Sequence, residues 1–179
     1  MIQFSKQIKR ILVTGGSGFI GSNLIRKLLN QTNIKVFNLD KVEYTDCLET
    51  FELCKDSNNY KLLNIDISNE TDVKEAIDIS NPDLVFHLAA ETHVDKSISV
   101  PKLFLNSNII GTFNLLEALL NHWKSLTESR RNQFRFLHVS TDEVFGSTDG
   151  NSLFTEQTRY DPKSPYSATK AASDHLVRS

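Results

Sequence analysis

The chain has 179 residues, of which 22 are acidic and 20 are basic, giving a formal net charge of -2 at pH 7. This length suits one domain with a sizeable core and is too short for two domains of ordinary size. Because the two signs of charge are mixed and no window approaches the ~18 apolar residues of a membrane span, the composition argues against a nucleic-acid partner and against a membrane.

Apolar runs and helical patterns alternate along the chain. In chain order they predict strand 10–14, helix 19–30, strand 35–40, strand 60–66, helix 70–80, strand 83–90, helix 103–124, strand 134–140 and a last helix from about Pro165. The connecting stretches 41–59 and 146–164 are polar, and the first is irregular with at most a short helix. The run 83–90 is almost continuously apolar, which is typical of a strand buried on both faces.

The alternation of strands and helices predicts the fold class. Buried strands separated by helices indicate an α/β domain in which a parallel sheet is covered on both sides. Crossover connections are right-handed, and a glycine-rich turn follows the first strand. The simplest topology is therefore a doubly wound parallel sheet of the Rossmann type, with strand order 3-2-1-4-5.

The glycine-rich turn has the sequence TGGSGFIG, from Thr14 to Gly21. Its glycines allow the backbone to turn tightly, to approach a pyrophosphate and to pack against the sheet, while the start of the following helix offers amide donors. A purely structural turn is the alternative. The residues expected to bind a dinucleotide here are Gly15, Gly18, Phe19, Ile20 and Gly21.

Asp40 ends the second predicted strand, 19 residues after Gly21. At this place a carboxylate accepts hydrogen bonds from an adenosine ribose and repels a 2′-phosphate, so the sequence favours NAD over NADP. Lys41 beside it can soften that preference. The alternative is a capping aspartate without a ligand.

Asp66 and Ile67 follow the third predicted strand. Ligands of open α/β sheets bind at the carboxyl ends of strands, where Asp66 can accept a hydrogen bond from an adenine amino group. An aspartate in front of a helix is equally well explained as a helix cap. Both interpretations stay open.

Tyr166 and Lys170 lie four residues apart at the start of the last predicted helix, and therefore on one face. A phenol with a pKa of ~10 acts as a base at neutral pH only if its anion is stabilised, which a neighbouring ammonium and a positively charged nicotinamide both do. An exposed pair without function is the alternative. Downstream of a dinucleotide turn, the pair predicts a catalytic base.

Asp142 and Glu143 follow the fifth predicted strand within the segment STDEVFG, 140–146. Adjacent carboxylates repel one another but suit a reaction that needs both an acid and a base. On a regular strand they would point to opposite faces, so we expect this segment to leave extended geometry. Solvated loop carboxylates are the alternative.

Three further residue types bear on compartment and core. Cys47 and Cys54 stand seven apart without a second pair, so we expect neither a metal site nor a disulfide. Two unpaired thiols and no apolar N-terminal leader predict a cytoplasmic protein. His87 lies within an apolar strand and is expected to be a core histidine, and Trp123 is expected to pack at a helix end.

Five motifs together resemble one known family. They are TGGSGFIGS, HLAAETHVDKSI, NIIGT, VSTDEVFG and PYSATKAASDHLVR, and they run from about Arg10 to the end of the chain. This set is similar to the extended short-chain dehydrogenase/reductase family. Within that family, Thr141 followed by Asp142 and Glu143 looks like the nucleotide-sugar 4,6-dehydratases, and the implied substrate is dTDP-glucose.

The resemblance implies a role for each matching residue. Tyr166, helped by Lys170 and Thr141, takes the proton of the sugar C4 hydroxyl while hydride passes to NAD; Glu143 then takes the C5 proton and Asp142 protonates the departing C6 hydroxyl. The hydride returns to C6, so the net reaction is loss of water. The resemblance also implies a homodimer, a structural Asn108 near the nicotinamide, and a cofactor-lining segment that comprises Leu88, Ala89 and Ala90.

The sequence departs from the family in two ways. Phe145 stands where the family commonly has tyrosine, and the family continues beyond the position of Ser179 with further strands and a C-terminal substrate domain. We therefore expect residues 1–179 to be an incomplete NAD-binding Rossmann domain, with weak NAD binding and little turnover alone. Another nucleotide-sugar epimerase, dehydratase or decarboxylase, or a non-catalytic NAD-binding protein, are the alternatives. His93, Asp95 and Ser97 lie in a segment that approaches the family's active site.

Overall fold

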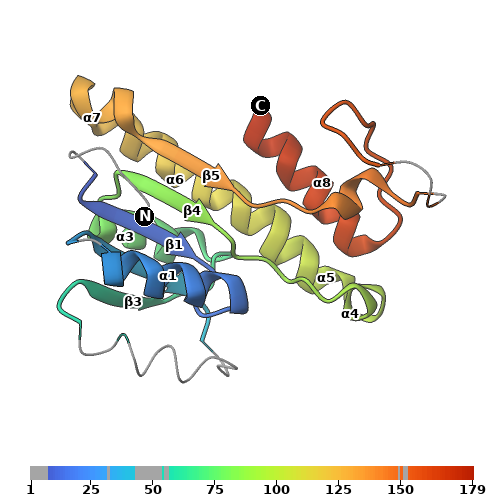
Figure 1. Ribbon diagram of the computed structural model, residues 1–179, viewed down its shortest axis with the longest axis horizontal. Coiled ribbons are helices and arrows are strands. Elements are labelled where there is room, and N and C mark those ends of the chain that lie inside the picture. Colours follow the sequence, from blue (N-terminus) through green and yellow to red (C-terminus); the bar gives the residue numbers. More distant parts are fainter. Residues whose placement is uncertain (1–7, 32, 43–53, 55–56, 149, 151–152) are drawn as a thin grey trace.

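The computed structural model describes residues 8–31, 33–42, 54, 57–148, 150 and 153–179. Their strands form one parallel sheet in the order β3-β2-β1-β4-β5, which confirms the predicted doubly wound topology (Figure 1). The strands are β1 (Arg10–Thr14), β2 (Lys35–Asp40), β3 (Tyr60–Asn64), β4 (Leu84–His87) and β5 (Arg135–His138).

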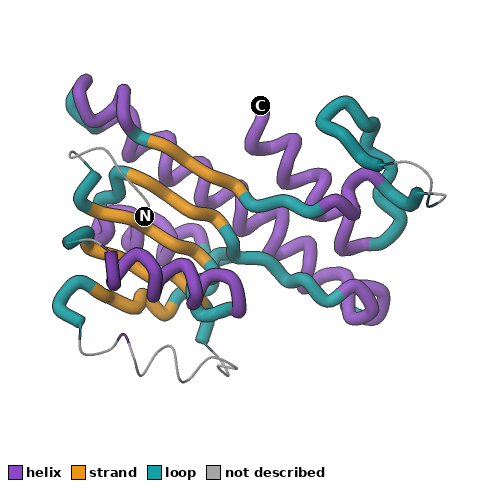
Figure 2. Tube along the Cα trace, in the orientation of Figure 1, coloured by secondary structure: helices purple, strands orange, loops and turns teal. Residues whose placement is uncertain are grey.

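Helical segments connect the strands and lie on both sides of the sheet (Figure 2). They are α1 (Phe19–Gln31), α3 (Glu70–Ser80), α4 (Val94–Ser99), α5 (Pro101–Phe104), the π-helical segment η1 (Leu105–Gly111), α6 (Thr112–Ser125), α7 (Glu128–Gln133), the 3-10 turn η2 (Asp142–Phe145) and α8 (Pro165–Arg178). Every helix predicted within the described residues is present. The short helices α4 and α7 were not predicted, and β3, β4 and β5 are shorter than expected.

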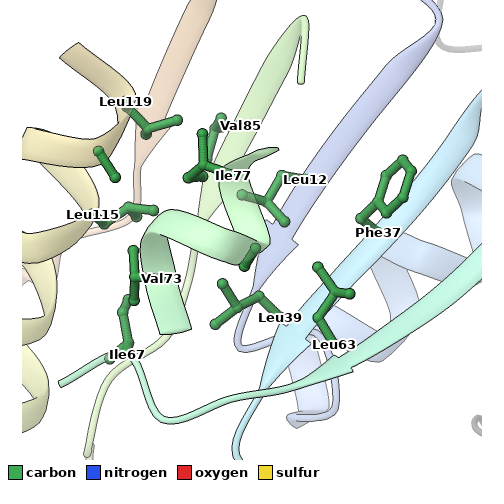
Figure 3. Packing of buried hydrophobic residues seen from close by; sticks show 12 residues of the cluster. Leu12, Phe37, Leu39, Leu63, Ile67, Val73, Ile77, Val85, Leu115 and Leu119 are labelled. Atoms are coloured by element: carbon green, nitrogen blue, oxygen red, sulfur yellow. The ribbon is translucent and has the colours of Figure 1, made fainter. Parts of the chain in front are cut away.

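Two apolar clusters hold the layers together. On one face of the sheet, α3 and α6 cover side chains of β1 to β4, as Figure 3 shows for Leu12, Val85, Ile77 and Leu115. On the other face, α1 packs on β1, β2 and β4. Burial of such apolar surface contributes ~25 cal/mol per Å² and is the main term that stabilises the sheet.

Local capping explains where two helices begin. The side chain of Asn69 accepts hydrogen bonds from the amides of Thr71 and Asp72 at the start of α3. At the start of α8, Ser164 and Ser167 exchange side-chain and backbone hydrogen bonds, and proline occupies the first turn. These caps satisfy amide groups that a helix leaves without partners, so α8 starts where the sequence predicts.

The long helical stretch Pro101–Ser125 is apolar enough, by length and composition, to cross a membrane. It is nevertheless interrupted by Asn106, Asn108 and Glu117, so it is not the run of ~18 apolar residues that the sequence analysis considered. Asn108, Thr112 and Asn114 are buried within the protein, and the Asn114 amide donates to the carbonyl groups of residues 67 and 68. Buried polar groups with protein partners identify a core helix that covers the sheet.

Strand β5 lies at one edge of the sheet formed by the described residues. Leu137 on this strand is 44% exposed, so an apolar side chain faces solvent at this edge. Most of the polar stretch 41–59, including Cys47, lies outside the described residues, so the short helix expected there is not tested.

Candidate active site

A cleft of about 1020 Å³ lies at the carboxyl ends of the strands. It opens where the strand order reverses between β1 and β4, which is the place where open α/β sheets bind their ligands. Every residue that the sequence predicts to bind a dinucleotide lines it: Gly15, Gly18, Phe19, Ile20, Gly21, Asp40, Lys41, Asp66, Ile67, Leu88, Ala89, Ala90, Tyr166 and Lys170.

The glycine turn forms one wall of the cleft. Gly15 has a φ of 69° and donates its amide to the Leu39 carbonyl, at 2.9 Å. A Cβ atom on Gly15 would lie 2.6 Å from the amide nitrogen of Ala89, and one on Gly21 would collide with the Gly15 carbonyl. A Cβ atom on Gly18 would meet only the Gly15 oxygen, at 3.4 Å, so Gly18 borders open space. The turn therefore leaves room for a phosphate against the backbone.

Asp40 is fixed against the glycine turn. One carboxylate oxygen accepts a hydrogen bond from the amide of Ser17, at 2.6 Å. Burial raises the pKa of the Asp40 carboxyl, and the hydrogen bonds from Ser17 oppose that shift. The sequence did not indicate Ser17, because the pattern of this turn is defined by its glycines and leaves the residue between them free.

Lys41 forms an ion pair with Asp66 across the mouth of the cleft, with 3.3 Å between the ammonium and the carboxylate. The other oxygen of Asp66 accepts hydrogen bonds from the amide and the hydroxyl of Ser68. Burial acts to raise the pKa of Asp66, but the hydrogen bonds from Ser68 and the charge of Lys41 outweigh it, so the pKa is lowered. The cap of α3 is Asn69, so Asp66 closes the turn before the helix and also lines the cleft.

Buried polar side chains hold the floor of the cleft in place. His87 bridges Thr14, at 2.7 Å, and Thr112, at 3.0 Å, and burial holds its pKa well below the usual range. The core role predicted for this histidine is confirmed. Asn108 exchanges two hydrogen bonds with the backbone of Glu91 and donates to Thr169 of α8. It therefore ties the end of β4 to the helix that carries Tyr166.

Tyr166 and Lys170 both lie inside the protein, 8% and 5% exposed, so the alternative of an exposed surface pair is excluded. The Lys170 ammonium donates to the Val139 carbonyl, at 2.8 Å. Burial lowers the pKa of Lys170, and the charge of Asp174 opposes that shift. The ammonium is therefore held at the Val139 carbonyl, and Lys170 lies four residues along α8 from Tyr166.

The pKa of Tyr166 is raised in this structure, chiefly by burial. A hydrogen bond with Thr141 lowers it, and the negative charges of Glu143 and Asp142 raise it. The sequence led us to expect a lowered pKa, because it shows which residues neighbour the phenol but does not show how deeply the phenol is buried.

The segment after β5 leaves extended geometry, as the sequence predicts. Asp142–Phe145 forms a 3-10 turn, and the Thr141 side chain caps it by accepting from the amide of Glu143. We call residues 141–145 the acid–base turn. Among the described residues that line the cleft, Ser140 and Tyr166 are present but Thr141, Asp142 and Glu143 are not. The two carboxylates therefore stand beside the cleft, on the side of the tyrosine.

His93, Asp95 and Ser97 lie at or in α4 and do not line the cleft, whereas the preceding residues Glu91 and Thr92 do. Ser97 is fully buried, and its hydroxyl donates to the Val94 carbonyl. Within residues 91–97, Glu91 and Thr92 therefore reach the cleft, and the helix that follows them does not.

A carboxylate that the sequence did not single out lies next to this site. Asp174 of α8 is 5% exposed and accepts hydrogen bonds from His138, Ser140 and Tyr160. Burial acts to raise the pKa of this carboxyl, but these hydrogen bonds and the charge of His138 bring it down to about 2 from 3.8.

Asp174 is expected to contribute to acid stability. Because its pKa is lower in the folded state, its contribution is present above pH ~4 and is lost as the pH falls towards 2. We expect Asp174→Asn to remove about 2 kcal/mol from the free energy of unfolding at pH 7. Urea unfolding at pH 7, 4 and 3 measures this, and a loss that is equal at all three values would contradict it.

Comparison with known proteins identifies the family. The model of the family described as GDP-mannose 4,6 dehydratase matches residues 12–179. The chain belongs to the GDP-mannose 4,6 dehydratase family. The match covers the glycine turn, the acid–base turn and the Tyr166 helix, so the resemblance to nucleotide-sugar dehydratases that the motifs indicate is confirmed.

Curated relatives of this chain carry names that are more specific than the family description. The dTDP-glucose 4,6-dehydratase of Salmonella typhimurium is 46% identical over 178 residues, and dTDP-glucose 4,6-dehydratase 1 of Escherichia coli K12 is 47% identical over 178 residues. Each alignment covers 94% of this chain and 49% of the relative. The chain thus spans about half the length of the curated relatives it matches.

Solved structures of similar proteins include two with NAD. The dTDP-glucose 4,6-dehydratase of Streptomyces venezuelae has a TM-score of 0.81 and 34% identity, and the UDP-glucose 4-epimerase of Thermus thermophilus has a TM-score of 0.79 and 29% identity. Both matches cover 94% of this chain and 50% of the solved chain. The GDP-mannose 4,6 dehydratase family fold is therefore shared by enzymes named for two different reactions.

Proposed function

We propose that this protein takes part in the dehydration of dTDP-glucose to dTDP-4-keto-6-deoxyglucose with NAD as cofactor. The observation that carries the proposal is the acid–base turn, which brings Asp142 and Glu143 beside Tyr166 at the edge of the cleft. The names of the curated relatives support the same substrate.

The residues that line the cleft fit NAD. The backbone at Gly18 borders open space suited to a pyrophosphate, and Asp40 stands where a ribose can donate to its carboxylate. Lys41 is engaged by Asp66, which reduces its ability to neutralise a 2′-phosphate. NAD supplies an acceptor that takes the hydride from the sugar C4 and later returns it to C6.

The chain's own groups then carry the protons. Tyr166 takes the proton of the C4 hydroxyl; its raised pKa means that this step needs added positive charge from Lys170 and from a bound nicotinamide. With a ketone at C4, the C5 proton becomes acidic, and Glu143 takes it as a general base. Asp142 gives a proton to the C6 hydroxyl, which leaves as water, and Glu143 returns its proton to C5 when C6 is reduced. Tyr166 then loses the proton that it took, and Asp142 regains one, by exchange with solvent.

Asp40 is expected to decide the choice of cofactor. A hydrogen bond to a charged group contributes about 1.5–3 kcal/mol, so we expect Asp40→Ala to weaken NAD binding about 10- to 100-fold and to narrow the gap between NAD and NADP. Titration calorimetry with both cofactors measures this. Asp40→Asn, which keeps the shape and loses the charge, is the matched control, and an unchanged NAD to NADP ratio in both variants would contradict the assignment.

The proposed reaction is tested with the intact protein, NAD and three separate donors: dTDP-glucose, UDP-glucose and GDP-mannose. Mass spectrometry detects the loss of one water. We expect this loss from dTDP-glucose. Water loss from another donor would keep the mechanism and change the substrate, and the absence of a product from all three would overturn the proposal. The same assay on residues 1–179 alone is expected to give little product, because we propose that this chain is the cofactor-binding part of the enzyme.

A 4-epimerase is the second candidate, since the Thermus thermophilus epimerase shares the fold at a TM-score of 0.79. An epimerase inverts C4 without removing water and needs no acid and base for C5 and C6. The pair Asp142 and Glu143 favours the dehydratase. Conversion of a donor to its C4 epimer without loss of mass would favour the epimerase.

We also infer a cytoplasmic homodimer. Large apolar side chains are exposed along the segments from α4 to α6: Ile98, Val100, Leu105, Ile110, Phe113, Leu120 and Trp123. Exposed apolar side chains gathered on neighbouring helical segments are typical of a protein interface, and an interface would account for the apolar composition of the stretch Pro101–Ser125. The mass of the particle in solution, from light scattering, tests the dimer.

A further inference from the structure

Asp174 is a buried carboxylate that the proposed reaction does not use. One oxygen accepts from the His138 ring, at 3.0 Å, and the other accepts from the hydroxyls of Ser140, at 2.6 Å, and Tyr160, at 2.8 Å. An ionised carboxylate only accepts hydrogen bonds, so all three partners must be donors. The His138 ring therefore carries its proton on the nitrogen that faces Asp174, and it is not available there as a base.

The residues that Asp174 and Lys170 of α8 bind through hydrogen bonds are consecutive in sequence. His138 and Ser140 are bound by Asp174, and the carbonyl of Val139 between them is bound by Lys170, at 2.8 Å. Helix α8 thus contacts each residue of the segment 138–140 through a hydrogen bond. The acid–base turn begins at the very next residue, Thr141.

The spacing of side chains on α8 connects Asp174 to the residues proposed to catalyse the reaction. Tyr166, Lys170 and Asp174 are each four residues apart, so their side chains lie along one face of the helix. The first contacts Thr141, the second holds Val139, and the third holds the residues on either side of Val139. The position of the acid–base turn relative to the phenol is therefore fixed by one rigid element at three points.

We propose that Asp174 is a positioning residue, which holds the acid–base turn at the distance from Tyr166 that the elimination of water requires. This rests on the proposed function. Asp174 does not line the cleft among the described residues, so it acts through Ser140 and His138 and not on the substrate. Misplacement of a reacting group by about 1 Å can cost ~100-fold in rate, which sets the scale of the effect.

Two variants and one matched control test this in the intact protein. Asp174→Asn keeps the shape but replaces one acceptor oxygen by a donor, and Ser140→Ala removes one contact on the segment that leads to the turn. The control is Tyr160→Phe. It removes a contact to the same carboxylate oxygen as Ser140, keeps the ring that packs on Phe145, and leaves the segment 138–140 bound.

The first measurement separates kcat from KM for water loss. We expect kcat to fall about 30- to 100-fold in Asp174→Asn and about 10-fold in Ser140→Ala, with KM and NAD affinity within about threefold of the wild type. Tyr160→Phe is expected to keep kcat within about threefold. Equal losses in Ser140→Ala and Tyr160→Phe, or a loss of NAD affinity in place of kcat, would show that Asp174 only supports the fold.

The second measurement does not depend on activity. Amide hydrogen exchange reports local opening of the backbone, and we expect the amides of Val139, Glu143 and Gly146 to exchange at least ~10-fold faster in Asp174→Asn, with no change in the turn 15–21. If the wild type converts no nucleotide sugar, the proposed function fails while this result still decides whether Asp174 holds the turn. Unchanged exchange in the segment 139–146 would overturn the inference.

Discussion

Changing Gly15 to alanine is expected to destabilise the protein before any cofactor is added. The added Cβ atom would lie 2.6 Å from the Ala89 amide nitrogen and 2.8 Å from the Leu88 carbonyl carbon, both backbone atoms that cannot move aside alone. The φ of 69° adds the strain of a left-handed conformation. We expect a loss of at least about 2 kcal/mol in the free energy of unfolding, measured by urea denaturation without NAD.

Gly18→Ala is the matched control for this prediction. Its Cβ atom would meet only the Gly15 oxygen, at 3.4 Å, so the free energy of unfolding should stay within about 0.5–1 kcal/mol of the wild type. The methyl group would stand in the space that we assign to the pyrophosphate, so NAD affinity should fall about 100-fold. A Gly18→Ala protein that binds NAD normally would contradict that assignment.

Tyr166→Phe is expected to have the largest effect on turnover. General acid–base catalysis contributes typically 10²–10⁴-fold, and no other phenol lines the cleft among the described residues, so we expect kcat to fall about 10³-fold. NAD affinity should change little, because the aromatic ring remains and only its hydroxyl is lost. Steady-state kinetics of water loss and calorimetry with NAD measure the two quantities.

The control for this variant is Tyr60→Phe. The Tyr60 hydroxyl accepts a hydrogen bond from Asn38, and Tyr60 does not line the cleft. We expect its kcat to stay within about threefold of the wild type.

The pKa of the Tyr166 hydroxyl gives a second, direct test of its chemistry. In the free protein, Tyr166 should show a pKa above the usual range, and NAD should lower it. Full turnover in Tyr166→Phe would remove the tyrosine from the mechanism.

Much of the fold could be predicted because its signals are local. Strands β1 and β2 and helix α3 have the predicted bounds, since each combines an apolar period with a clear end, such as Asn81 with its left-handed φ of 41° after α3. Because crossover connections between parallel strands are right-handed, few strand orders then remain to be considered. Helices α4 and α7 escaped prediction because six residues show too little periodicity.

The candidate site was predictable to the extent that its residues follow strand ends in sequence. Gly15, Asp40 and Asp66 do so, and they meet at one edge of the parallel sheet. Asp174 was not predictable, because its role depends on partners 34 and 36 residues away. For the same reason, the raised pKa of Tyr166 depends on burial that only the packed structure defines.

The π-helical segment η1 sets where the chain can vary in length. A π-helix closes its turns with i→i+5 hydrogen bonds, so Leu105–Gly111 holds more residues per turn than the α-helices on either side of it. Deleting one residue from η1 would let this segment return to α-helical geometry, and Asn114 and Leu115 of α6 would stay in the interior, where both are buried. Deleting one residue within α6 could not be absorbed in this way and would rotate the residues beyond it by about 100°. Homologous chains whose lengths differ by one residue in this region are therefore expected to differ at η1 and not in α6.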